Sequence, residues 1–402
     1  MNILFLSLYE IKDSDSGYIY ADLIREFAGH GHSVYAVSPT KEKAETFIDG
    51  NGVHIIRVKN GQIQKTGKIK KLINLLMLEK NTIKTVEKYV KDIKFDLIVN
   101  MCSNLCYAKT SEYFKKRDNA VNYLLLKDIF PQNAVDMDMM KTSGIIGLVY
   151  KHFRNKEKRM YKRADFIGCM SRANKKYILD HDPEVGDKLT VLPNSICPQD
   201  VSITKVERDE LRAKYGLPPD KTVFVYGGNL GKPQSIPFVI DCLRTQTDNE
   251  GVFFLILGDG TDYAKFEDFL KEEPQSNIKL LKRLPREEFD RMLSACDVGM
   301  LFLDHRFTVP NYPSRLLSYM QAGIPVFACT DPNTDVSTDI EEGGLGWCCN
   351  SGDASDFVEV IKKIENSDLE QMGINARSYL LNNFTVEKSY QIIMGDYSKA
   401  RA

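Results

Sequence analysis

Short apolar runs alternate with longer polar stretches along the first half of the chain. Residues 2–8 (NILFLSL) are almost continuously apolar and predict a buried strand, which a polar turn and a helix near 20–29 follow. Further strands are predicted at 32–39, 53–59, 95–101, 121–126 and 165–171. Apolar strands separated by helical stretches are typical of a parallel sheet covered on both faces.

The same alternation starts again after a break. The segment LTVLPN (189–194) ends the first series, and a polar stretch to about residue 207 reads as a linker. New strands are predicted at 222–228, 252–260, 278–284, 298–303 and 324–329. An amphipathic segment from about residue 384 closes the chain. We therefore expect an α/β protein of two doubly wound, Rossmann-like domains (1–198 and 199–383) facing a cleft, with a C-terminal helix (384–402) that packs back on the first domain.

Composition fits a folded protein with reduced thiols. Of 402 residues, 43% are hydrophobic and 27% charged, and the nine cysteines are scattered without a zinc pattern. The first residues lack the basic region of a signal peptide, and no apolar run approaches the ~20 residues of a membrane span. We expect a cytoplasmic protein that is soluble or peripherally bound to the membrane.

Charge is distributed unevenly, with an excess of eight positive charges in residues 1–200 and of nine negative charges in 201–402. Two basic stretches, 57–71 and 151–163, each adjoin apolar residues at helical spacing. Such a helix suits the anionic inner leaflet of a membrane, but an ordinary core-facing helix with a solvated charged side has the same pattern. The stretches lack interleaved aromatic platforms, so nucleic acid is not an expected partner.

Candidate chemistry begins where the strand 222–228 ends, in the turn GGNLGKPQS (227–235). Its glycines allow positive φ and close approach of a ligand, Ser235 is a candidate helix cap, and Lys232 lies in the turn where it can meet an anion. GDG (258–260) ends the next strand in the same way. In VPNYPSRLLSYMQAGIPV (309–326), Ser314 is placed to cap a helix that has Arg315 in its first turn.

These motifs, with LLKRLPREEF (280–289), LPNSI (192–196) and the opening unit ending in GHSVYAVSP, resemble nucleotide-sugar-dependent glycosyltransferases of the GT-B fold. The closest resemblance is to family 4 and its bacterial capsule and O-antigen members, such as N-acetylfucosamine transferases. It implies retaining transfer from a UDP-sugar to an undecaprenyl-diphosphate-linked saccharide at the inner leaflet, with no metal and no other cofactor.

The resemblance also assigns residues. The donor diphosphate is expected at Gly228, Asn229, Lys232, Gln234, Ser314 and Arg315, and the nucleoside at Gly258, Asp259, Arg283 and Ser318. Lys127 and Asp128, after the strand 121–126, are the catalytic candidates, although Asp128 also fits a turn cap before Pro131. Gly17, Asn311 and Tyr312 are expected on the acceptor side of the cleft.

The chain departs from the family pattern at four positions. Asn229 and Gln234 stand where the family has an Arg and a Lys on the diphosphate, so we expect Lys232 and Arg315 to supply the charge. Pro310 and Ser318 stand where the family has two glutamates, the second of which binds the ribose. Two alternatives stay open at this point: a sugar-nucleotide 2-epimerase, and a non-catalytic scaffold that binds sugar nucleotides.

Overall fold

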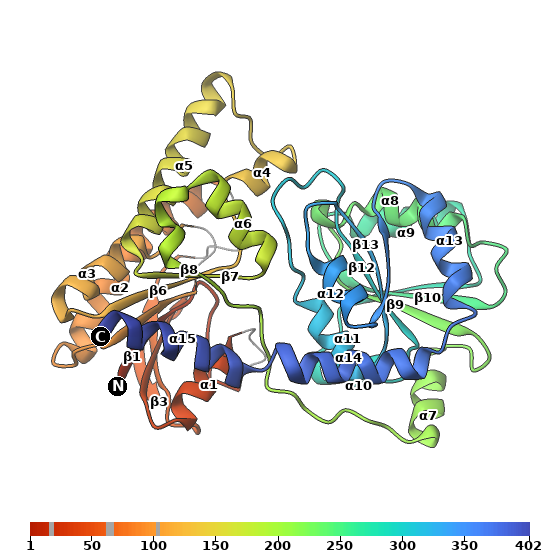
Figure 1. Ribbon diagram of the computed structural model, residues 1–402, viewed down its shortest axis with the longest axis horizontal. Coiled ribbons are helices and arrows are strands. Elements are labelled where there is room, and N and C mark those ends of the chain that lie inside the picture. The colour runs from red at the N-terminus through yellow and green to blue at the C-terminus, as the bar shows by residue number, and fades with distance from the viewer. Residues whose placement is uncertain (16–19, 62–67, 102–104) are drawn as a thin grey trace. The chain divides into compact units, whose positions relative to one another are not determined.

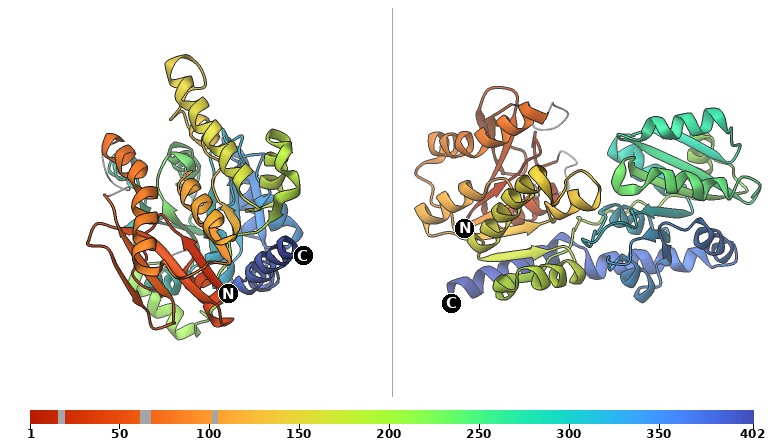
Figure 2. Two further views of the ribbon diagram at one scale, coloured as in Figure 1. Left: turned by 90° about the vertical axis from the view of Figure 1, so that its left-hand side faces the viewer. Right: turned by 90° about the horizontal axis from the view of Figure 1, so that it is seen from above.

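The chain forms two compact units, shown in a computed structural model that describes residues 1–15, 20–61, 68–101 and 105–402, with the backbone alone for 68–72 and 145. The first unit comprises Met1–Cys197 together with Thr385–Ala402, and the second comprises Pro198–Phe384. Helices cover both faces of each unit's sheet (Figures 1 and 2). Both units are thus doubly wound α/β structures, as the apolar pattern predicts.

The first unit contains an eight-stranded sheet in the order β3-β4-β2-β1-β5-β6-β7-β8, parallel except for the β3–β4 pair. Its strands are β1 (Asn2–Leu6), β2 (Ser33–Thr40), β3 (Glu45–Ile48), β4 (His54–Lys59), β5 (Leu97–Asn100), β6 (Val121–Leu126), β7 (Phe166–Cys169) and β8 (Leu189–Val191). Its helices are α1 (Ala21–Gly29), α2 (Lys68–Val90), α3 (Ala108–Asp118), α4 (Gln132–Asp136), α5 (Gly144–Arg163), α6 (Arg172–His181), the 3₁₀ turn η1 (Pro183–Lys188) and α15 (Val386–Arg401).

Alternate residues of β1 serve two separate cores, as the period of two in a strand requires. Ile3 and Phe5 pack with α1 and α15, whereas Leu4 and Leu6 pack on the opposite face with α2 and α3. The last helix belongs to the first of these cores because Ile393 is fully buried in it. The predicted return of the C-terminal helix to the first domain is therefore confirmed.

The second unit contains a six-stranded, fully parallel sheet in the order β11-β10-β9-β12-β13-β14. Its strands are β9 (Thr222–Asn229), β10 (Val252–Asp259), β11 (Ile278–Lys282), β12 (Val298–Phe302), β13 (Val326–Thr330) and β14 (Gly346–Asn350). Its helices are α7 (Lys205–Tyr215), η2 (Lys232–Gln234), α8 (Ile236–Arg244), α9 (Tyr263–Glu272), α10 (Arg286–Leu293), α11 (Arg315–Ala322), α12 (Val336–Glu342), α13 (Ala354–Ile364) and α14 (Leu369–Asn383).

The strand order of the second sheet reverses between β9 and β12. The chain runs outward from β9 to β10 and β11, then returns to β12 on the other side of β9 and continues to β14. At such a switch point the connecting helices leave the sheet in different directions and open a crevice beyond the carboxyl ends of the strands. The second unit is therefore expected to bind ligands between the ends of β9 and β12.

Candidate functional site

A pocket of about 200 Å³ lies at this switch point. Its walls are the end of β9 (226–229), the end of β12 (301–303), residues 313–315 before and at the start of α11, and Gln234. Five of the six residues predicted to bind the diphosphate line it, namely Gly228, Asn229, Gln234, Ser314 and Arg315. Residues from two separate motifs thus meet at one place, as the crevice rule requires.

Arg315 gives this pocket its charge. It is the first residue of α11, so its guanidinium adds to the positive end of the helix dipole. The guanidinium lies over the ring of Phe289, 4.6 Å from the ring centre, and among the described residues it forms no ion pair with a carboxylate. Burial raises the pKa of nearby Asp290, against the opposing effect of Arg286 and Arg315. Two positive features without a paired anion make the pocket suited to a negatively charged ligand.

The glycines act by packing rather than by unusual backbone angles. Positive φ is predicted for Gly227, Gly228 and Gly231, and this is wrong, because none of them has it. A Cβ atom on Gly227 would lie 2.4 Å from the ring of Phe289, so this glycine makes room for the ring that supports Arg315. A Cβ atom on Gly258 would lie 2.0 Å from the carbonyl oxygen of Gly228. Glycine is required here for close approach of neighbouring elements.

Hydrogen bonds fix the pocket's polar wall. Asn229 Nδ2 donates to Gln234 Oε1 at 2.9 Å, and the Tyr226 hydroxyl donates to the carbonyl oxygen of Asn229 at 2.7 Å. The Tyr319 hydroxyl accepts from the amide of Gly227 at 3.2 Å and donates to the carbonyl oxygen of Met300 at 3.0 Å, so it links β9 to β12. Asn229 and Gln234 thus form a neutral amide pair.

Lys232 does not join the pocket. It begins the 3₁₀ turn η2, is exposed, and is not among the lining residues. Ser235 and Ser314 occupy the N-cap positions of α8 and α11, but neither side chain makes a capping hydrogen bond. Of the two cations predicted at the diphosphate, Arg315 lines the pocket and Lys232 does not.

The predicted nucleoside residues lie mostly along the neighbouring strand ends. Gly258 pairs in register with Gly228 and with Lys282, and Asp259 pairs with Asn229. Arg283 follows directly after β11 and is exposed, as is Asp259. Ser318 lies on α11, half-buried and outside the lining residues. The register brings Gly258, Asp259 and Arg283 to one edge of the sheet, beside the pocket.

Tyr312 is buried in the second unit. Only 4% of it is exposed, and its hydroxyl donates to Asp339 Oδ2, while Tyr379 donates to the other oxygen of the same carboxylate at 2.9 Å. Its ring packs near Phe384. Asn311 Nδ2 donates to the carbonyl oxygen of Val309 at 3.1 Å. Tyr312 therefore packs in the interior of the second unit, and an acceptor contact for it remains a prediction.

The first unit presents Lys127 and Asp128 directly after β6. Asp128 is exposed, whereas Lys127 is half-buried and donates from Nζ to the carbonyl oxygen of Leu192 at 3.3 Å. Burial lowers the pKa of Lys127 to about 7. Helix α4 begins at Gln132 without a side-chain cap. Gly17 lies outside the described residues.

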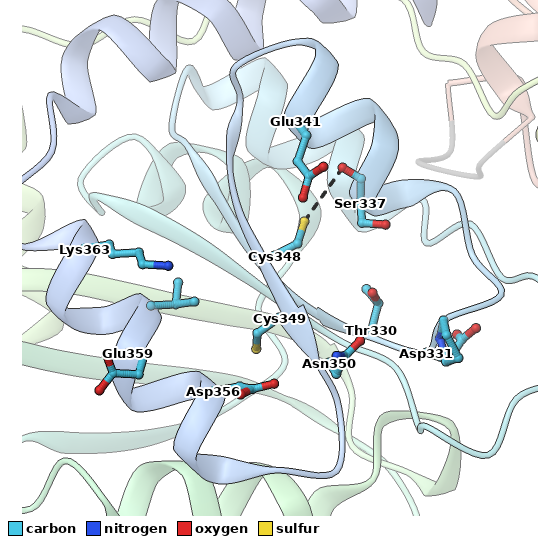
Figure 3. A pocket seen from close by; sticks show the side chains of 12 residues that line it. Thr330, Asp331, Ser337, Glu341, Cys348, Cys349, Asn350, Asp356, Glu359 and Lys363 are labelled. Atoms are coloured by element: carbon cyan, nitrogen blue, oxygen red, sulfur yellow. Dashed lines mark hydrogen bonds between the residues drawn. The ribbon is translucent and has the colours of Figure 1, made fainter.

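A larger pocket, of about 380 Å³, lies beside the edge strand β14 between α12 and α13 (Figure 3). Cys348 faces α12, where its thiol donates to the carbonyl oxygen of Ser337 at 3.9 Å, and Cys349 lies toward α13. The walls carry four carboxylates and one lysine, namely Asp331, Glu341, Asp356, Glu359 and Lys363. This excess of negative charge opposes a diphosphate, so the smaller pocket is the better candidate despite its size.

Three aromatic residues support the candidate site although the sequence does not predict this role for them: Phe289, Tyr226 and Tyr319. Phe289 sits in REEFDRML (286–293), where its apolar neighbours at helical spacing predict only a core contact. The glycine at position 227 is the one signal available, since a missing side chain within an apolar strand indicates close approach of another group. That signal does not reveal which group approaches.

Three comparisons place the chain among known proteins. Residues 207–379 match the family model "Glycosyl transferases group 1". "Probable glycosyltransferase WbjE" of Pseudomonas aeruginosa is 27% identical over 267 residues, which cover 65% of this chain and 64% of that protein, just under two thirds of its length. The match to the family model thus falls within the second unit, where the candidate pocket lies.

Solved structures match the whole chain. Sucrose-phosphate synthase from Thermosynechococcus elongatus has a TM-score of 0.76 and 14% identity, with coverage of 100% of this chain and 99% of that one. HepE of Anabaena in complex with UDP-glucose has a TM-score of 0.72 and 16% identity, with coverage of 99% and 100%. Likeness at this identity establishes the fold. The protein has the GT-B fold of glycosyltransferases.

Proposed function

We propose that this protein is a glycosyltransferase that binds a nucleoside-diphosphate sugar, namely a UDP-sugar, in the pocket between the ends of β9 and β12. In the reaction the bond between the anomeric carbon and the β-phosphate oxygen breaks, and a bond from that carbon to an acceptor hydroxyl oxygen forms. The hydroxyl proton passes to the departing phosphate or to Asp128, and UDP leaves. Attack on the face from which UDP departs retains the anomeric configuration.

The observation that carries this proposal is Arg315 at the start of α11, a cation that has no carboxylate partner in the described part of the chain and lines the pocket beside Gly227 and Gly228. A departing diphosphate gains negative charge in the transition state, and a preorganised guanidinium together with a helix N-terminus stabilises that charge. The same pair can serve in place of a metal ion, so we propose metal-independent transfer. HepE of Anabaena, which shares the fold, has a crystal structure in complex with UDP-glucose.

For the acceptor we propose an undecaprenyl-diphosphate-linked saccharide, bound by the first unit at the inner leaflet. Helix α5 supports this choice, because Ile146, Leu148 and Val149 near its start are 50%, 65% and 45% exposed. Four basic residues further along α5 are also exposed: Lys151, Lys158, Arg159 and Lys162. Exposed apolar residues beside basic ones suit an anionic bilayer surface. Among the described residues, no helix has the length and apolarity to cross a bilayer.

Not all of the predicted basic residues contribute to this surface. Arg57 is largely buried and paired with Glu10 and Glu45 at 2.7 and 2.6 Å. Arg154 pairs with Glu157 and Asp182 at 2.7 and 2.5 Å. Their charges are already compensated within the first unit, and residues 62–67 of the first stretch lie outside the described part. The membrane proposal therefore rests on α5.

The family 4 motifs lead us to propose an N-acetylated amino sugar as the transferred group, in capsule or O-antigen synthesis. The alternative of a 2-epimerase has less support, because the lining of the described pocket contains no carboxylate or imidazole that could move a proton at the sugar. A scaffold that binds sugar nucleotides would use Arg315 in the same way, so turnover and not donor binding distinguishes it from an enzyme.

One assay separates these readings. The full chain is incubated with a panel of nucleotide sugars, with and without undecaprenyl-diphosphate-linked saccharide, in the presence of EDTA. We expect UDP release that depends on the acceptor. Release of UDP with a free, altered sugar would establish epimerisation, and binding of UDP without any release across the panel would leave only the scaffold.

A further inference from the structure

Three potential metal ligands meet where the last helix packs on the first. His30 follows α1 and lies with its Nε2 atom 3.1 Å from Glu26 Oε1 and 3.2 Å from Glu387 Oε2. Glu26 lies on α1 and Glu387 in the first turn of α15, and both helices belong to the first unit (Figure 1). The three ligand atoms all lie within 4.8 Å of one another.

These distances agree with the geometry of a small divalent cation. Zinc bonds to nitrogen and oxygen ligands are about 2.0–2.2 Å, so the corners of a tetrahedral site are about 3.3–3.6 Å apart. The observed separations of 3.1 and 3.2 Å need only a slight opening of the cluster to admit an ion. The side chains of His30 and Glu387 are 38% and 48% exposed, so an ion can enter and water can supply a fourth ligand.

The imidazole is held in this orientation by its neighbours. The His30 ring stacks on Tyr390 with 3.9 Å between ring centres and 7° between planes. Tyr390 is itself held, because its hydroxyl bonds His32 Nε2 at 3.0 Å and its ring packs against Phe27. Metal-binding histidines need such outer contacts to fix the ring. Nε2 is therefore directed at the two carboxylates before any ion arrives.

The two carboxylates converge on the same ring nitrogen. Each places an oxygen within 3.2 Å of His30 Nε2, so two negative charges lie close to one point of the structure. A divalent cation at that point would be attracted by both carboxylates.

We propose that Glu26, His30 and Glu387 form a binding site for a divalent cation of the zinc class, which fastens the C-terminal helix to α1. The site takes its ligands from residues 357 positions apart in the chain. Binding stabilises the folded first unit, because the unfolded chain cannot bring these ligands together. The role is structural and independent of the donor pocket.

The test is binding of Zn²⁺ and Co²⁺ to the full chain, measured by equilibrium dialysis, absorption spectroscopy and thermal unfolding. We expect one ion per chain, Co²⁺ bands without sulfur charge transfer, and a higher unfolding midpoint with metal. His30→Gln and Glu387→Gln should each weaken binding by about tenfold or more, because even outer-shell changes cost that much, and should abolish the shift in midpoint.

Glu370→Gln is the matched control, since Glu370 lies in the first turn of α14 as Glu387 does in α15. It should bind metal as the parent chain does. UDP affinity should be the same for all variants, which separates this test from that of the glycosyltransferase proposal. Metal binding that persists in both cluster variants, sulfur charge-transfer bands from the cysteines, or no binding by the parent chain would overturn the proposal. Glu26→Gln replaces any variant that fails to fold.

Discussion

Two pockets of the second unit lie against the same sheet but carry opposite charge. One opens between the ends of β9 and β12, where glycine and amide walls surround Arg315. The other opens between α12 and α13 beside β14, where four carboxylates face one lysine. In both places the neighbouring helices leave the sheet on different faces. The topology thus supplies more than one crevice, and side-chain charge decides which of them can hold a diphosphate.

The largest effect is expected from removing the cation of the first pocket. Arg315→Ala should weaken UDP binding by roughly 1.5–3 kcal/mol, or about 10- to 150-fold, because a charged hydrogen-bond donor is lost. Isothermal titration with UDP measures this. Lys363→Ala, which removes the cation of the acidic pocket, is the matched control and should leave the affinity unchanged. Equal losses of UDP affinity in the two variants would contradict the assignment of UDP to the first pocket.

A second change tests the close packing on which the first pocket depends. In Gly258→Ala the new methyl group meets the backbone oxygen of Gly228, and backbone atoms cannot move aside cheaply. We expect a loss of about 1–3 kcal/mol in the free energy of unfolding, measured by denaturant titration. Gly50→Ala, at a position with open space and ordinary backbone angles, should cost far less.

A smaller effect is expected from the ring beneath the guanidinium. Phe289→Leu keeps an apolar side chain against Gly227 but removes the aromatic face on which Arg315 lies. The contact is worth about 0.5–1 kcal/mol at a partly exposed site, so UDP affinity should fall about two- to fivefold. In the Arg315→Ala background the same change should have no further effect. A full additional loss in that background would show that Phe289 acts independently of Arg315.

The smallest effects are expected at two exposed or acidic positions. Lys232→Ala should change UDP affinity by less than about twofold, because the lysine stands outside the pocket and an exposed charge contributes little. Asp356→Asn, in the acidic pocket, should also change UDP affinity by less than about twofold. A tenfold loss in Lys232→Ala would return this residue to the diphosphate site and show that the turn moves when the donor binds.

The sequence predicts the architecture well because apolar periodicity is a local signal. The central strands of both sheets and the returning helix follow from it, whereas the edge strands β3 and β14 do not, since ETFI and GWCCN are short and half-buried or exposed. For the candidate site, the motifs predict that a small set of residues lies together, and these residues line one pocket: Gly228, Asn229, Gln234, Ser314 and Arg315. Contacts between distant segments could not be predicted, such as Phe289 under Arg315 or Asp339 at the Tyr312 hydroxyl.

The return of the last helix to the first unit has a consequence for biosynthesis. Val386 donates its amide to Ile196, the Tyr123 hydroxyl bonds Asp396, and Ile393 fills the core beside β1. The ribosome delivers these partners only after the entire intervening unit has emerged. During synthesis, the first unit therefore exposes an apolar face until α15 has been made. A chain truncated just after the second unit would expose that face permanently.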